Sequence, residues 1–157
     1  MEIKQIIQSQ YLAALEMLKE AILACPDSLW NNPKDLNPTW DLAYHTLFYV
    51  HLYLQDTEED FVPWEKHQPK DKRKLYTKDE ILVYVTVVQE QVAEKVPALN
   101  LDAESGFYWL PFNKLELQFY SIRHVMQHAG ELYERIGSHI EKELPWVGMY
   151  PLPKKKK

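Results

Sequence analysis

Four long segments of the chain carry apolar side chains at the three-to-four-residue spacing of an α-helix, and this spacing limits the folds open to it. The first segment covers residues 3–24 and stops before Pro26. The second begins at Thr39, which we interpret as an N-cap, and runs to about Gln55. Apolar residues at this spacing form a stripe that a helix buries against its neighbours. We therefore expect helices over both segments.

The third and fourth segments begin with capping motifs. Thr77 and Asn113 each stand three residues before a glutamate, whose backbone N–H can donate a hydrogen bond to the capping side chain. The third helix is expected over residues 77–97, although its β-branched run over 81–88 also fits a strand. The fourth helix is expected over residues 113–143.

The connection between the second and third predicted helices is long for a compact domain. Residues 56–76 begin with acidic and end with basic side chains. We expect a crossover that contains a short helical turn and packs Phe61, Val62 and Trp64 against the helices. No segment has a convincing strand pattern. The predicted fold class is therefore all-α, a four-helix bundle with a long crossover between helices two and three.

Length and composition fit one domain. Of the 157 residues, 46% are hydrophobic, which is enough for a sizeable core. We expect a single domain over residues 1–150 and a disordered tail of prolines and lysines over residues 151–157. The net charge of −5 becomes −9 without the four lysines of this tail. A general nucleic-acid-binding protein needs a basic surface, so we expect no nucleic-acid partner.

Cysteine content and hydropathy indicate a location. Cys25 is the single cysteine, so the chain cannot form an internal disulfide, and nothing points to an oxidising compartment. No apolar stretch reaches the length that spans a membrane without charged residues. We therefore expect a cytoplasmic protein without a membrane partner.

Two histidines, His124 and His128, stand four residues apart in the fourth predicted helix. That spacing stacks their side chains one turn apart on one face. At about 100° per residue, the pair lies at the edge of the apolar arc of the helix, beside charged residues. This position fits a site in a cleft, and it equally fits two histidines in solvent.

A third histidine, His45, occupies the middle of the second predicted helix, which is apolar on nearly every side. A buried imidazole needs a partner for its ring nitrogens. One interpretation is a core histidine bonded to a tyrosine, an aspartate or the backbone. The other is that His45 joins the pair on the fourth helix, because three neutral imidazoles form a site for a first-row transition metal.

The other three histidines are expected outside such a site. His51 lies on a different side of its helix from His45. His67 stands in a lysine-rich connection and is expected in solvent. His139 follows His128 by eleven residues, which corresponds to about 16 Å along a helix.

These histidines resemble the pattern of the DinB-like superfamily, which includes the YfiT-type metal-dependent hydrolases. The resemblance rests on His45 within Ala43-Tyr-His-Thr-Leu-Phe, on the H-x-x-x-H of residues 124–128 with the Ala-Gly-Glu-Leu that follows it, and on the helix order. It implies that His45, His124 and His128 bind a divalent metal, usually zinc or nickel. It also implies a hydrolase or a transferase of a thiol cofactor, acting on a small-molecule substrate.

Carboxylates and tyrosines stand near the three histidines. A hydrolase needs a general base, and the candidates are Glu131, one turn beyond the pair, and Asp41, one turn before His45. Either can instead orient an imidazole or belong to the charged surface. Tyr49 and Tyr120 lie one turn from the histidines, where they line a pocket or pack in the core. The aromatic patch over residues 107–109 roofs the cleft or caps the core.

A second function is also compatible with the chain. Aromatic residues make up 13% of it, and the apolar arc of the fourth helix is broad. The alternative to an enzyme is therefore a non-catalytic helical module for dimerisation or ligand binding. A homodimer is compatible with both functions.

Overall fold

The computed structural model describes residues 2–150, and the regular structure in this range is helical apart from an isolated bridge between Glu104 and Asn113. The predicted all-α class is thereby confirmed. No helix among these residues combines the length and the apolar character needed to cross a membrane. The tail predicted over 151–157 lies outside the described residues. The elements are α1 (Ile3–Ala24), α2 (Asp27–Trp30), α3 (Thr39–Tyr53), the short 3₁₀-helix η1 (Lys70–Lys72), α4 (Lys78–Ala98) and α5 (Lys114–Ile140).

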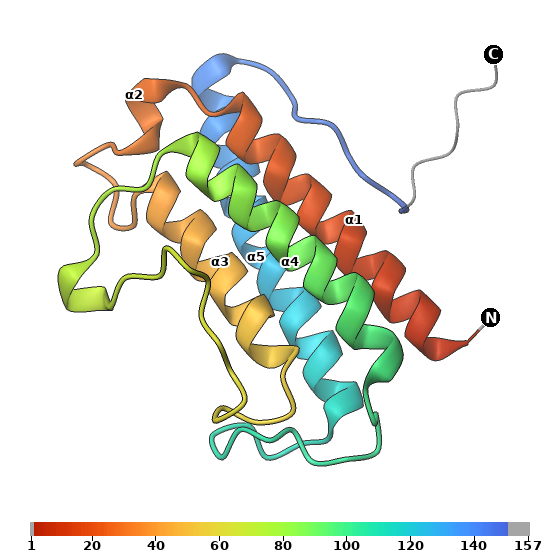
Figure 1. Ribbon diagram of the computed structural model, residues 1–157. Coiled ribbons are helices and arrows are strands. Elements are labelled where there is room, and N and C mark those ends of the chain that lie inside the picture. The colour runs from red at the N-terminus through yellow and green to blue at the C-terminus, as the bar shows by residue number, and fades with distance from the viewer. Residues whose placement is uncertain (1, 151–157) are drawn as a thin grey trace.

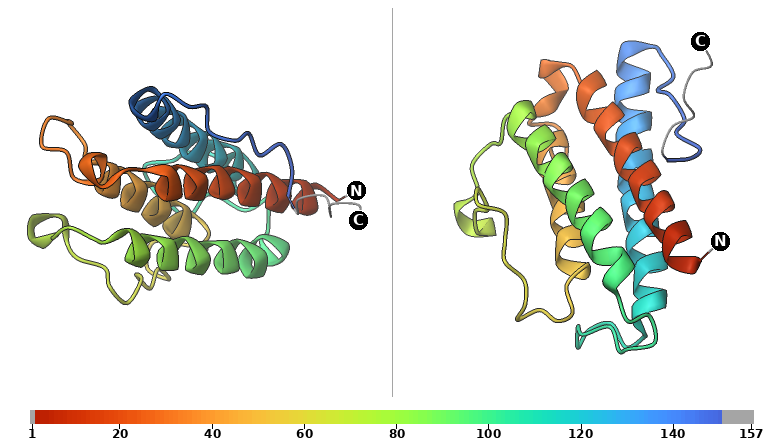
Figure 2. Two further views of the ribbon diagram at one scale, coloured as in Figure 1. Left: turned by 90° about the horizontal axis from the view of Figure 1, so that it is seen from above. Right: turned by 45° about the vertical axis from the view of Figure 1, so that its right-hand side comes forward.

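The four long helices lie side by side (Figure 1 and Figure 2). Helices α1 and α3 each pack against both α4 and α5, so their apolar stripes meet in one core. This core contains Leu18 of α1, Leu47 of α3, Val88 of α4 and Leu132 of α5, all fully buried. The contact between α3 and α5 brings His45 opposite the histidine pair.

The start of α3 differs from the prediction. Thr39 is the first helical residue, and Pro38 occupies the N-cap position without a side-chain hydrogen bond. The hydroxyl of Thr39 is buried and accepts a hydrogen bond from Arg135 of α5, so it joins two helices instead of capping its own. The fixed φ of Pro38 suits the turn into the helix. The helix ends at Tyr53, two residues before the predicted end.

Both predicted capping motifs are present. The Thr77 hydroxyl accepts a hydrogen bond of 3.2 Å from the backbone N–H of Glu80, and the Glu80 carboxylate accepts one of 2.9 Å from the backbone N–H of Thr77. The Asn113 side chain accepts from the backbone N–H of Glu116 over 2.9 Å. The β-branched run over 81–88 is helical. The ends of α4 and α5 lie within three residues of those predicted.

The crossover between α3 and α4 contains the expected helical turn, η1 (Figure 1). Trp64 is buried and stacks on Tyr84 of α4, with ring centroids 4.5 Å apart. Phe61 lies edge to face with Phe48 of α3. Val62, however, is 76% exposed, so its predicted packing is wrong. Phe61 contacts α3 and Trp64 contacts α4, whereas Val62 between them faces solvent.

Candidate metal centre

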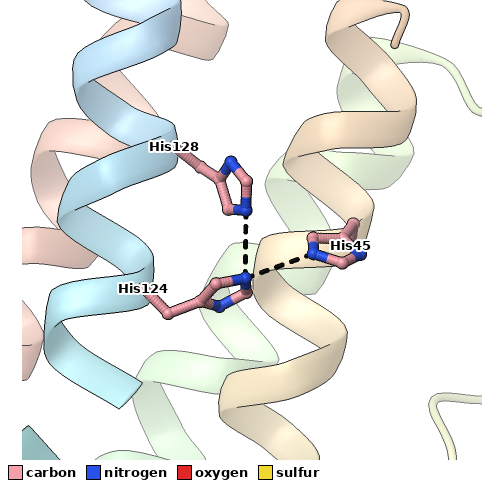
Figure 3. Close-up of side chains that lie close together, drawn as sticks. All are labelled: His45, His124 and His128. Carbon is pink, nitrogen blue, oxygen red and sulfur yellow. Dashed lines mark hydrogen bonds between the residues drawn. The ribbon is translucent and has the colours of Figure 1, made fainter. Parts of the chain in front are cut away.

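The three histidines singled out in the sequence meet in space. Figure 3 shows His124 and His128 of α5 pointing toward His45 of α3. The Nε2 atom of His124 lies 3.2 Å from Nε2 of His45 and 3.0 Å from Nε2 of His128. One ring nitrogen from each histidine lies within 4.8 Å of the other two. Two imidazole nitrogens bound to one tetrahedral zinc ion are roughly 3.3 Å apart, so the two measured separations are close to those of a ligand set.

Packing holds the three rings at these positions. The His124 and His128 rings stand one turn apart on α5, edge to face, with centroids 4.5 Å apart. The His45 ring packs edge to face against both of them at 5.1 Å. Tyr49, one turn after His45 on α3, adds edge-to-face contacts with His45 and His124. Helix periodicity and the contact between α3 and α5 therefore suffice to bring three imidazoles together.

The environment keeps two of the imidazoles neutral. Burial and the neighbouring His128 lower the pKa of His45. Burial, followed by the charges of His128 and His45, lowers the pKa of His124 from 6.5 to about 4. A neutral imidazole retains the lone pair that a metal requires, whereas a protonated one does not.

Glu131 lies against the third imidazole. The Nδ1 atom of His128 donates to Oε2 of Glu131 over 3.2 Å. In the neutral imidazole this tautomer places the lone pair on Nε2, the atom that faces His124. Burial acts to raise the pKa of the Glu131 carboxyl, but hydrogen bonds from His128 and Gln127 outweigh it and lower this pKa. Glu131 is therefore placed to orient the imidazole of His128, one of the roles considered for it from the sequence.

Asp41 lies beside the cluster but is engaged elsewhere. Its carboxylate accepts a hydrogen bond of 2.7 Å from Arg73 in the crossover. The guanidinium of Arg73 also lies 4.5 Å from the ring centroid of Tyr44. Asp41 therefore joins the crossover to α3 next to His45.

The Nδ1 atom of His124 is buried and has no hydrogen-bond partner within residues 2–150. Metal-binding histidines usually donate from their second nitrogen to a carboxylate, a carbonyl or water. His124 departs from that pattern, and its ring is held by its contacts with His45 and Tyr49.

Two pockets adjoin the histidines and share His45 and Tyr49 in their linings. The first, of about 520 Å³, includes His45 and His128 and carries the charged side chains of Asp41, Lys70 and Arg73. We call it the charged pocket. The second, of about 330 Å³, is lined by His45, Tyr49, Tyr53, Trp109, Tyr120 and His124. We call it the aromatic pocket. Of the tyrosines predicted to line a site, Tyr49 lines both pockets and Tyr120 lines the aromatic one.

His67 is half-buried, whereas the sequence predicts it in solvent. It forms a short hydrogen bond with the Tyr44 hydroxyl, and its ring stacks on Tyr44 and Phe48 of α3. It lines the charged pocket. The lysine-rich sequence around it gives no sign of this placement, because the aromatic rings that stack on it belong to α3. His51, as expected, lies elsewhere, and its Nδ1 is 3.2 Å from the Tyr84 hydroxyl.

Several residues beside the histidines escape prediction from the sequence. Lys70 and Arg73 belong to a basic run that resembles a solvated loop. Tyr53 has a usable signal, because it follows Tyr49 by four residues and lies on the same helix face. In the aromatic patch over 107–109, Phe107 is buried while Trp109 lines the aromatic pocket, so the patch performs both predicted roles with different residues.

Comparison of the chain with protein-family models, with curated proteins and with solved structures finds no match. The site is therefore interpreted from its own geometry and chemistry.

Proposed function

We propose that the protein is a divalent-metal-dependent enzyme, built as a DinB-like four-helix bundle, with His45, His124 and His128 as metal ligands. The observation that carries this proposal is the separation of the Nε2 atoms, 3.2 Å and 3.0 Å from His124 to the other two histidines. The charge, the hydrogen bonding and the accessibility of these imidazoles each add to it.

The donor set fits a metal ion. Two of the three imidazoles have pKa values lowered by burial, and the third has its Nδ1 engaged by Glu131. Three protein ligands with a further position open to solvent or substrate are typical of catalytic zinc sites, whereas structural sites use four. Imidazole ligands suit zinc and nickel. Such an ion would acidify a bound water or bind a substrate thiolate at its open position.

The side chains around the histidines have roles in this proposal that do not depend on the reaction. Glu131 holds His128 in the tautomer that presents Nε2 to the cluster. Lys70 and Arg73 place two positive charges against one negative charge, Asp41, in the charged pocket, which favours an anionic group on a substrate. Both proposed reactions, hydrolysis and thiol transfer, need such a small-molecule site beside the open position.

Cobalt substitution tests the open position. We expect Co²⁺ added to the metal-free protein to give the intense visible bands of a low-coordinate site. Addition of 2-mercaptoethanol is expected to produce a sulfur-to-cobalt charge-transfer band. His45→Ala should lose both features, while His139→Ala, at the far end of α5, should keep them. A weak spectrum like that of cobalt in water, or equal spectra for the two variants, would contradict the proposal.

A further inference from the structure

The aromatic pocket differs in chemistry from the charged pocket. Tyr49 and Tyr53 of α3, Tyr120 of α5 and Trp109 of the connection before α5 contribute four rings to it, beside His45 and His124. Within the described part of the chain, no aspartate, glutamate, lysine or arginine lines it. The two pockets share His45, and each adds one histidine of α5, His128 in the charged pocket and His124 in the aromatic pocket. A molecule bound at the histidines therefore has a charged pocket and an uncharged pocket next to it.

The rings of the aromatic pocket are held in place by one another. Tyr53 packs against Tyr49 at 5.5 Å and edge to face against Tyr120 at 6.0 Å between centroids. The indole Nε1 of Trp109 donates to the Tyr53 hydroxyl over 3.5 Å, and its ring also contacts Phe107 at 5.6 Å. Tyr49 and Tyr120 thus pack against the buried Tyr53, while Trp109 is 37% exposed and is held by its contacts with Tyr53 and Phe107. The tyrosine walls therefore need little ordering when a ligand enters.

Size and charge indicate which group fits. A cavity of about 150 Å³ accommodates benzene, so a pocket of about 330 Å³ has room for one substituted aromatic ring. Aromatic walls favour a second aromatic ring in an edge-to-face or offset arrangement. They also attract cations, but the guanidinium of Arg123 already lies 5.6 Å from the Tyr120 ring centroid and opposes a second positive charge. An anion would lose water, and no cationic side chain among the described residues lines the pocket to replace it.

We infer that the aromatic pocket binds an uncharged aromatic group of the substrate, whose reacting end lies at the three histidines. The assignment of the reacting end rests on the proposed metal-dependent function. The binding of the aromatic group rests on the pocket alone. The substrate class is thus a small molecule that joins an uncharged aromatic ring to a metal-binding group.

The first experiment follows the indole N–H signal of Trp109 by NMR in metal-free protein, assigned by its loss in Trp109→Phe. Benzamide is expected to shift this signal saturably, with a dissociation constant of about 1 mM, while acetamide leaves it in place. Tyr120→Ala should weaken benzamide binding about tenfold or more. Phe119→Ala is the matched control, because Phe119 is 56% exposed and does not line the pocket. Equal responses to the two amides, or equal losses in the two variants, would overturn the inference.

The second experiment uses zinc-loaded protein and a pair of metal-binding probes, benzohydroxamate and acetohydroxamate, measured by calorimetry. We expect benzohydroxamate to bind about tenfold or more tightly, and Tyr120→Ala to remove that advantage. Binding of both probes with equal affinity contradicts the inference and leaves the metal site intact. Failure of both to bind, with benzamide still shifting the Trp109 signal, contradicts the metal-dependent function and supports the aromatic pocket.

Discussion

The Nε2 atoms of His45 and His124 lie 3.2 Å apart, although 79 positions separate the two residues in the chain. The contact is made across the interface of α3 and α5, and both rings are half-buried. Burial of two unpaired imidazoles side by side is costly unless they share a proton or a metal ion.

Glu131 is expected to support metal binding through His128. Glu131→Ala removes the acceptor of the His128 Nδ1 proton and should weaken zinc binding about 10- to 100-fold, as loss of a supporting residue does in other sites. Glu131→Gln keeps an acceptor oxygen and should cost less. Competition with a zinc chelator measures both. Glu134→Ala, an exposed carboxylate one turn away, serves as control, and an equal effect there would contradict the role of Glu131.

The pair of Arg73 and Asp41 is expected to stabilise the crossover against α3. Their side chains are 16% and 32% exposed and lie 2.7 Å apart, so the coupling should be about 1 kcal/mol, near the upper end for pairs that solvent reaches. A double-mutant cycle with Arg73→Ala and Asp41→Ala, measured by urea unfolding, gives this free energy. If the losses of the two single variants add up to the loss of the double variant within about 0.3 kcal/mol, the two residues act independently and the expectation is wrong.

Lys114 is expected to be a large contributor to stability. Its Nζ donates to the backbone carbonyls of Gln55, Asp56 and Ser105 over 2.6–2.7 Å, and thereby fastens the connections that follow α3 and precede α5. Lys114→Met keeps much of the volume but leaves these carbonyls without their donor. The free energy of unfolding should fall by about 2–4 kcal/mol. The exposed Lys142→Met should change it by less than about 0.5 kcal/mol, and a similar loss in both would contradict the role of Lys114.

His51 is expected to reduce stability at acidic pH. Burial lowers its pKa in the folded protein from 6.5 to about 4, so the unfolded chain binds the proton more tightly. Folded-state stability should therefore decrease as pH falls from about 6.5 to 4, by up to about 3 kcal/mol. His51→Asn keeps an acceptor near the Tyr84 hydroxyl and should make this decrease shallower. Thermal unfolding between pH 4 and 7, with a chelator present, measures the slope. The same change of slope in His139→Asn would contradict the assignment to His51.

The helices and the three candidate ligands could be predicted because their signals are local. The capping box at Thr77 identifies the start of α4, and periodicity distinguishes that helix from a strand. The four-residue spacing of His124 and His128 needs only the helix to become a stacked pair. For His45, an ionisable side chain in an apolar helix is a signal in itself.

Other features depend on contacts between segments far apart in the chain. In the sequence, Lys114 resembles a surface lysine at the start of a helix. The three carbonyls that accept its hydrogen bonds come from the two connections that fold around it. His67 stands among lysines, yet it is half-buried because Tyr44 and Phe48 of α3 stack on it. Thr39 resembles an N-cap, but the arrival of Arg135 from α5 engages its hydroxyl. These contacts depend on the path of the connections across the helices. The periodicity of apolar residues in the sequence does not specify that path.

The metal content of tag-free protein tests the central proposal most directly. After dialysis against zinc or nickel and removal of free ions, elemental analysis should give one ion per chain. His45→Ala, His124→Ala and His128→Ala should each lose more affinity than the roughly 10- to 100-fold expected for a supporting residue. His139→Ala, with unchanged circular dichroism, should retain the ion. Wild-type protein that holds far less than one ion per chain, or binding unaffected by all three ligand substitutions, would contradict a metal centre at these histidines.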